Sequence, residues 1–469
     1  MLSLEKGMDQ VHHVLKADQM ANIALKMLAC INREVVLHSV RTAYLSYKTV
    51  CVHPLNEKCS TEKLVMLALF HTLGYFREDI HFNYFPHEAN LNYFTNEKST
   101  ESKYVFACYY LEYMTPLKED AVGLQNFLEP YNKDLRQYVY QEEYKDVIAM
   151  CARISDYVMK NPDKPLPADL NEIAPGFFDP EYVEAFVKAN KDNILNEKIK
   201  AGTHFDEITE LVSTIQLSPE DNKMLEKMLI HLLDFKSTTT MKHSINASSY
   251  ALSLGLRMNL SSRDLTILYN SAFLHDFGKM ATPQRILEFP GKLSPEDMGI
   301  MRHHVNHSKR ILHGFVDDEI LETVYRHHEK LNGKGYPRHV EGKELTLVQR
   351  ILTVADITSA LNDSRSYKGE FSKEKTISII KGMTDKGELD AQITKFVIED
   401  FDELVKEQQV FRDMLAIDFS TVIIHYNNYI YEDIDLWVEM LLNATTPYTE
   451  NDGIEDIEDI EELEDLEEL

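Results

Sequence analysis

Apolar residues recur at intervals of three and four over most of this chain, and this spacing constrains its fold more than any other feature. Residues 248–260 (SSYALSLGLRMNL) and 263–280 (RDLTILYNSAFLHDFGKM) show the pattern clearly. A period of 3.6 residues places such side chains on one face of a helix. Glycine and proline, which interrupt helices, number only 17 and 15 in 469 residues, and alternating strand patterns are scarce. We therefore predict an all-α fold.

Acidic residues outnumber basic ones, with 77 Asp and Glu against 49 Lys and Arg, and the formal net charge is −28. This charge argues against broad electrostatic binding to DNA, RNA or an anionic membrane surface. A small anion can still bind at a local cluster of metal ions, lysine and arginine. The five cysteines form no CxxC pair, as expected for reduced thiols. Because signal-peptide and membrane-span patterns are lacking, we expect a cytoplasmic protein.

An ordered set of seven potential metal ligands and one lysine occurs between residues 243 and 356. The ligands are His243, His275, Asp276, one of the adjacent His303 and His304, His327, His328 and Asp356. Any single histidine is more often structural, but the whole set at ordered intervals favours a metal site. Seven ligands exceed the positions of one octahedral ion, whereas two ions that share Asp276 leave room for water and a phosphate. We therefore predict metal-dependent hydrolysis of a phosphodiester.

Three further groups suit the binding of an anionic substrate. Lys279 follows Asp276 by three residues, so both share one face of a helix. In NGKGYP, residues 332–337, the glycines let backbone N–H groups approach an anion, and Tyr336 can stack on a base or hydrogen-bond a phosphate. A compact cationic group follows the last aspartate of the set: Arg365, Tyr367 and Lys368. This group suits a second phosphate, and the alternative is a solvated surface turn.

Residues from about 235 to 400 resemble the HD-GYP family, a branch of the HD phosphohydrolase superfamily. The likeness rests on HDFGK for HDxGK, HHEKLNGKGYP for HHExxxGxGYP, ADITSAL for the aspartate helix, and RSYK after it. This bacterial family is all-helical. It hydrolyses 3′,5′-linked cyclic dinucleotides, mainly cyclic di-GMP and in some members 3′3′-cyclic GMP-AMP, at a bimetal or trimetal centre that usually holds iron or manganese.

The resemblance implies a role for each matching residue. The metal ligands would be His243, His275, Asp276, His304, His327, His328 and Asp356, with His304 chosen by the family alignment. Lys279 resembles the lysine that contacts the scissile phosphate, and it joins Asp276 as a catalytic residue. The remaining substrate contacts would be Gly335, Tyr336, Arg365 and Lys368. Thr239 stands where members with a third metal have glutamate, which favours two divalent ions, iron or manganese.

A weaker copy of the same pattern occupies the first half of the chain. His38, His71 and Asp156 repeat the order of His243, His275 and Asp356; His38 and His71 are 33 residues apart, His243 and His275 32. Thr72 takes the place of the first aspartate, and Phe127 and Leu128 fall where the double histidine would stand. We interpret this half as a degenerate, non-catalytic repeat with a structural, dimerising or sensory role. Chance similarity of two helical segments is the alternative.

The predicted architecture is a tandem of HD-type helical domains with five segments. They are a degenerate HD-like domain at 1–195, a connecting helix at 196–235, an HD-GYP catalytic domain at 236–405, a C-terminal helical segment at 406–448 and an acidic tail at 449–469. The degenerate domain is the expected contact for a second copy of the chain or for a signalling partner.

The predicted activity is hydrolysis of cyclic di-GMP or 3′3′-cyclic GMP-AMP to a linear dinucleotide, with a second cut to mononucleotides as an extension. The sequence does not decide between these two substrates. One alternative is an HD hydrolase of another nucleotide, such as a dNTP or an alarmone, against which the GYP segment argues. The other is a cyclic-dinucleotide sensor or adaptor without activity, against which the full ligand set and Lys279 argue.

Overall fold

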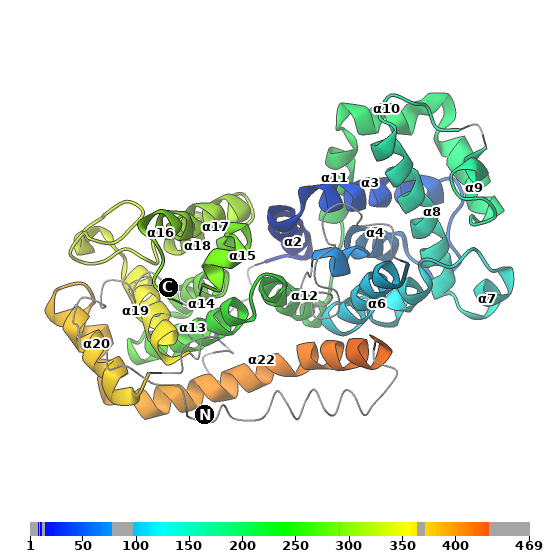
Figure 1. The fold of residues 1–469 in the computed structure, drawn as a ribbon. Helices are drawn as coiled ribbons and strands as arrows, with labels where there is room; N and C mark the ends of the chain where they lie inside the picture. The colour runs from blue at the N-terminus through cyan, green and yellow to red at the C-terminus, as the bar shows by residue number, and fades with distance from the viewer. Residues whose placement is uncertain are drawn as a thin grey trace. The chain divides into compact units, whose positions relative to one another are not determined.

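The computed structural model describes residues 15–76, 97–167, 169–289, 291–363 and 371–430, with Met8, Gln10 and Val11. Regular structure in these residues is helical, and an isolated bridge joins Asn332 and Glu341 (Figure 1). The predicted all-α fold is therefore confirmed. The predicted contacts Arg365 and Lys368 and the acidic tail lie outside the described residues.

No helix in the described part of the chain combines the length and the apolar character that crossing a membrane requires.

The chain divides into two compact units. The N-terminal unit comprises residues 16–228 and 418–434, and the C-terminal unit comprises residues 1–15, 229–417 and 435–469. The boundary at residue 228 falls inside the segment that the sequence predicts as a connecting helix. The functional roles predicted for the individual segments remain predictions.

The N-terminal unit is built around three helices that pack together, α3, α4 and α8. Its helices are α2 (Ala17–Ile31), α3 (Arg33–Val50), α4 (Thr61–Phe70), η1 (Leu73–Phe76), α6 (Glu97–Met114), η2 (Lys118–Asn126), α7 (Lys133–Tyr138), α8 (Gln141–Lys160), η3 (Leu170–Glu172), α9 (Pro180–Ala189), η4 (Lys191–Asn193), α10 (Ile194–Ala201), α11 (His204–Ser213) and the first part of α12 (Pro219–Leu232). Side-chain caps start α3 and α4: Asn32 accepts from Glu34 and Val35, and Ser60 accepts from Lys63.

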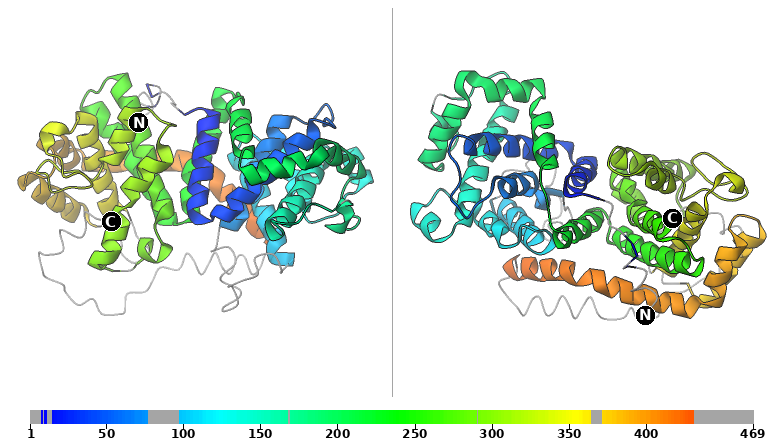
Figure 2. Two further views of the ribbon diagram at one scale, coloured as in Figure 1. Left: turned by 90° about the horizontal axis from the view of Figure 1, so that it is seen from above. Right: turned by 180° about the vertical axis from the view of Figure 1, so that it is seen from behind.

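The C-terminal unit has α13 at its centre, packed against α14 and α19 (Figures 1 and 2). Its helices are η5 (Leu233–Phe235), α13 (Thr238–Arg257), α14 (Ser262–Leu274), η6 (Phe277–Ala281), α15 (Gln284–Leu287), α16 (Pro295–Arg302), α17 (His304–Leu312), α18 (Asp318–Tyr325), η7 (Gly342–Glu344), α19 (Leu347–Asn362), α20 (Lys373–Asp385), α21 (Ala391–Glu399) and the first part of α22 (Phe401–Ile430). Hydroxyl caps on Ser261, Ser294 and Thr346 start α14, α16 and α19. They satisfy backbone N–H groups that the first helical turn leaves unpaired.

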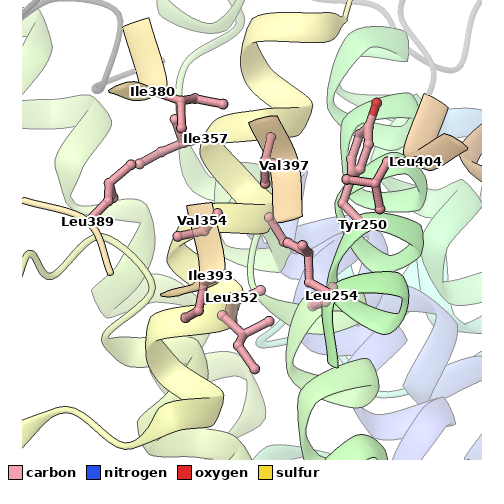
Figure 3. Packing of buried hydrophobic residues seen from close by; sticks show 14 of the residues in the cluster. Tyr250, Leu254, Leu352, Val354, Ile357, Ile380, Leu389, Ile393, Val397 and Leu404 are labelled. Carbon is pink, nitrogen blue, oxygen red and sulfur yellow. The ribbon is translucent and has the colours of Figure 1, made fainter. Parts of the chain in front are cut away.

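A buried apolar core holds α19 against its neighbours. Figure 3 shows Ile393 of α21 beside Leu352 and Val354 of α19, and Leu404 of α22 beside Tyr250 of α13, all members of one cluster. Because this face of α19 is fixed in the core, the position of Asp356 on the same helix is fixed as well. The core therefore decides where one of the predicted metal ligands stands.

Replacement of a core side chain that is not a predicted ligand should destabilise the C-terminal unit. Ile380 of α20 is fully buried, and Ile380→Ala is expected to lower the free energy of unfolding by about 2–5 kcal/mol through lost burial and a residual cavity. Chemical denaturation followed by circular dichroism measures this change. The exposed neighbour Lys381 supplies the control, Lys381→Ala. Equal stability of the two variants would contradict the packing described.

Candidate metal centre

The His275-Asp276 pair lies where α14 ends and η6 begins, and a close contact between η6 and α17 fixes the position of this junction. A Cβ atom on Gly278 would lie 2.0 Å from the carbonyl oxygen of His304, so glycine is required. Ser308 reinforces the contact, since its hydroxyl accepts from the Gly278 N–H at 2.8 Å and donates to the His275 carbonyl at 2.6 Å. The junction therefore brings Asp276 next to the first turn of α17.

The structure brings the seven predicted ligands together as two groups of three and one further aspartate. The groups are His243, His275 and Asp276, and His304, His327 and His328; within each group the ligand atoms lie within 4.8 Å of one another. Among the described residues, groups with this spacing occur in the C-terminal unit alone. His303 is exposed while His304 is buried in the cluster, so the geometry agrees with the choice of His304.

Two carboxylates connect the groups. Asp276 lies 3.2 Å from His275 Nε2 through Oδ2 and 3.5 Å from His304 Nε2 through Oδ1. Asp356 lies 2.8 Å from His243 Nε2 through Oδ1 and 3.6 Å from His328 Nδ1 through Oδ2. Each carboxylate therefore faces both groups, the arrangement that a two-ion site needs.

Three of the histidines are oriented by the same backbone hydrogen bond. The Nδ1 atoms of His275, His304 and His327 lie 2.7, 2.8 and 2.6 Å from the carbonyl oxygens of Ala272, Met301 and Val324, three residues earlier in each case. With Nδ1–H as the donor, the lone pair of each ring is on Nε2, which faces the centre. Such bonds set the tautomer that a metal ligand requires.

Burial keeps several of these imidazoles neutral. It lowers the pKa of His304 to about 4 and that of His327 to about 3. Burial alone would raise the pKa of Asp276, but the neighbouring His275 and Lys279 hold it well below the usual value. His304 and His327 are therefore neutral nitrogen donors beside an ionised Asp276, which is the state that binds a cation.

His243 differs because it stands between carboxylates. Burial lowers its pKa, but hydrogen bonds to Asp356 and Asp363 outweigh this effect and raise the pKa to about 9. A proton on His243 thus compensates the carboxylate charge, and a bound cation would have to displace it.

Buried atoms without hydrogen-bond partners indicate that the residues fit a cation. The Nε2 atom of His275 and both carboxylate oxygens of Asp276 are buried and make no regular hydrogen bond, and the ion pair with Lys279 reaches Oδ2 alone. An unpaired buried polar group costs about 1–3 kcal/mol, and more if it is charged. A metal ion would supply the missing partner, and nitrogen and oxygen donors are ligands that divalent metal ions accept.

Two residues that the sequence analysis missed contact His243 from the side opposite Asp356. The Nδ1 atom of His243 lies 3.0 Å from Ser359 Oγ and 3.2 Å from Asp363 Oδ2, and Ser359 donates to Asp363 at 2.8 Å. The signal was present, because Asp356, Ser359 and Asp363 follow the i, i+3, i+7 spacing of one helix face.

The predicted substrate residues of the GYP segment lie at the edge of the centre. The Tyr336 ring stacks on His328, with centroids 4.7 Å apart, and the Tyr336 N–H donates to the His328 carbonyl at 3.1 Å. A Cβ on Gly335 would lie 2.5 Å from that same carbonyl oxygen. Gly335 is therefore needed for close packing of the loop on the double histidine, a reason that the sequence analysis did not foresee.

Lys279 is buried beside the first group of ligands. Its Nζ atom lies 2.9 Å from Asp276 Oδ2. The ion pair holds the ammonium group at the centre, as the sequence analysis expected from the spacing of the two residues.

The repeated motif residues of the first half of the chain also lie together, in the N-terminal unit. His38 Nδ1 lies 2.9 Å from Asp156 Oδ1, and the rings of His38 and His71 are 5.5 Å apart, the same separation as for His243 and His275. Aromatic rings take up the space beside them: Phe127 lies 5.2 Å from His71 and stacks on Tyr104 at 4.1 Å.

Comparisons with known proteins find a matching domain family for most of the C-terminal unit. Residues 227–393 match the HD domain family model. The chain is 30% identical over 207 residues to 3′3′-cGAMP-specific phosphodiesterase 1 of Vibrio cholerae, covering 44% of this chain and 46% of that protein. It is 29% identical over 174 residues to the cyclic di-GMP phosphodiesterase response regulator RpfG of Xanthomonas campestris. This match covers 36% of this chain and 46% of that protein. The matches thus span less than half the length of these two relatives.

A solved structure extends the likeness in fold. A cyclic GMP-AMP specific phosphodiesterase of V. cholerae superposes with a TM-score of 0.52 at 16% identity, covering 81% of this chain and 96% of that one. This coverage exceeds the share of the chain held by either compact unit. The similarity in fold therefore includes residues of both units.

Loss of the Asp363 carboxylate, which contacts His243, should weaken metal retention. Asp363→Asn removes the charge that orients His243 and is expected to lower metal affinity by about 10–100-fold. Metal content after dialysis against graded chelator, measured by mass spectrometry, checks this. Asp385→Asn, at an exposed position of α20, is the matched control. Unchanged retention in Asp363→Asn would show that Asp363 does not position His243.

Proposed function

We propose that this chain, whose residues 227–393 match the HD domain family model, is a metal-dependent phosphodiesterase that hydrolyses a cyclic dinucleotide. One observation carries the proposal: two groups of ligands face each other across Asp276 and Asp356, with a buried lysine at the same carboxylate. The printed names of the relatives support this class of substrate, since they include enzymes for 3′3′-cGAMP and for cyclic di-GMP. Either of these two is the proposed substrate.

The proposed cofactor is a pair of divalent ions, iron or manganese. His243, His275 and Asp276 would hold one ion, and His304, His327 and His328 the other. Asp356, which faces both groups, completes the set of seven. When bound, the ions would polarise the scissile phosphate and supply an activated water for in-line attack.

Lys279 is the proposed contact for the phosphate that is cut. Its ammonium group is fixed by the ion pair with Asp276 and shielded from solvent. A preorganised cation in a buried site stabilises charge that develops on phosphoryl oxygens more strongly than a solvated one. The same group can also assist the leaving 3′-oxygen, directly or through water.

The GYP segment is proposed to receive the rest of the substrate. Gly335 and Tyr336 lie against His328, so a nucleotide bound at the metal ligands would meet this loop. Arg365 and Lys368 remain predicted contacts, on the strength of the sequence alone.

The N-terminal unit is proposed to be non-catalytic, with a structural or regulatory role. Thr72 stands in place of a bridging carboxylate and bonds Ser39 at 2.7 Å. Phe127 and Tyr104 fill the space beside His71. The pair His38 and Asp156 would then be a packed remnant of the motif. Contact with a second copy or with a signalling partner through this unit stays a proposal.

The activity is tested on protein purified without oxygen and loaded with iron or manganese. The protein is incubated separately with cyclic di-GMP and with 3′3′-cyclic GMP-AMP, and the products are separated by chromatography. A linear dinucleotide should form from at least one of the two substrates. Asp276→Ala removes the carboxylate shared by both groups and should lower the rate by about a thousandfold or more. If both ions are present and neither cyclic dinucleotide is cleaved, the proposed function is wrong.

A separate variant tests the role of the lysine. Lys279→Ala is expected to reduce kcat by about 10²–10³-fold, the loss typical when one preorganised charge is removed from a transition state. Metal content, measured in parallel, should stay at the wild-type level, because Lys279 is not a ligand. Lys279→Arg retains the charge and serves as the conservative control. A full kcat in Lys279→Ala would exclude a catalytic role.

A further inference from the structure

A hollow lined by basic side chains opens beside the candidate metal centre. It encloses about 430 Å³ of empty space that includes open solvent. Its lining includes Arg302, His328, Lys330, Lys334, Tyr336 and His339. His328 belongs both to this lining and to the second group of predicted metal ligands, so the hollow and the centre are neighbours.

Ring contacts connect the hollow to the centre step by step. The Tyr336 ring stacks on His328 at 4.7 Å with an interplanar angle of 26°. The guanidinium carbon of Arg302 lies 5.4 Å from the centroid of the Tyr336 ring, within the range of a cation–π contact. Arg302 is exposed and ends α16, and His304 begins α17 only two residues later. The arginine is therefore anchored next to the proposed ligands, with its guanidinium group near the Tyr336 ring.

The charge of the hollow is opposite to that of the chain. Arginine, lysine and histidine line it, and none of the described residues in its lining is aspartate or glutamate, although the chain as a whole has a net charge of −28. Lys330 has an acidic neighbour, Glu388, at 3.4 Å. Arg302 and Lys334 are both exposed. A local positive potential in an acidic molecule concentrates small anions at that point.

We propose that this hollow is the subsite for the second phosphate of the substrate, the one that is not being cut, with Arg302 and Lys334 as its ligands. The inference rests on the proposed function. The two phosphates of a cyclic dinucleotide belong to one macrocycle, so when one lies at the metal ligands the other must lie close by. A planar guanidinium forms paired hydrogen bonds with a phosphodiester, and an ammonium adds a point charge.

This subsite would make the enzyme select substrates with two phosphates. A diester with a single phosphate can reach the metal ligands and Lys279, yet it has nothing to place in the hollow. The sequence suggests Arg365 and Lys368 for a second phosphate. The variants below leave both residues unchanged, so they test the hollow by itself.

The test compares two substrates in metal-loaded full-length protein. Arg302→Ala and Lys334→Ala should each raise KM for the cyclic dinucleotide about tenfold or more, as expected for loss of a hydrogen bond between charged groups. The kcat should change little, because neither residue touches the reacting atoms. KM for bis(4-nitrophenyl) phosphate, which has one phosphate, should not change. Arg302→Lys should restore part of the affinity, since it keeps the charge without the planar donor pair.

The matched control is Arg310→Ala. Arg310 is exposed on α17 and does not line the hollow, so both KM values should stay at the wild-type level. The subsite alone would be wrong if the wild-type protein cleaves the cyclic dinucleotide but Arg302→Ala and Lys334→Ala leave its KM unchanged. It would also be wrong if these variants raise KM equally for both substrates. A wild-type protein that cleaves neither cyclic dinucleotide would overturn the proposed function, and the subsite with it.

Discussion

The contacts of two buried carboxylates, Asp276 and Asp356, with the surrounding histidines organise the candidate metal centre of the C-terminal unit. Each is surrounded by histidines from other helices, with His243 at 2.8 Å from Asp356 and His304 at 3.5 Å from Asp276. A buried negative charge is tolerated only with a positive partner. The proton on His243 and the ammonium of Lys279 are partners within the chain, and bound cations would be stronger ones. Helix ends, glycine contacts and the core on α19 all serve to hold these groups in place.

The N-terminal unit shows the consequence when a bridging carboxylate is absent. His71 makes the same backbone bond as His275, with Nδ1 2.7 Å from a carbonyl three residues earlier. Its pKa falls to about 3 because burial disfavours the charged ring, and the space beside it is filled by Phe127. A neutral histidine among aromatic rings needs no ion. The same helical arrangement can therefore serve as a packed core or, with two carboxylates, as a cation site.

Much of this arrangement was predictable from the sequence, because helical spacing and ligand chemistry are local properties. The all-α fold was confirmed, and the residues proposed as ligands do lie together. Asp363 could have been found, because its spacing from Asp356 was visible in the sequence. Arg302 was missed for a physical reason, since its importance arises from a contact with Tyr336 that only the folded chain brings about. Gly335 was identified, but its need for close backbone packing became visible only in three dimensions.

The most direct test of the account is the number and position of metal ions in the full-length chain. Protein purified without oxygen should contain two transition-metal ions, and anomalous X-ray scattering should place both between Asp276 and Asp356, with none at His38 or His71. A chain with a single ion, with none, or with an ion in the N-terminal unit would contradict the claim that the two carboxylates organise a two-ion centre.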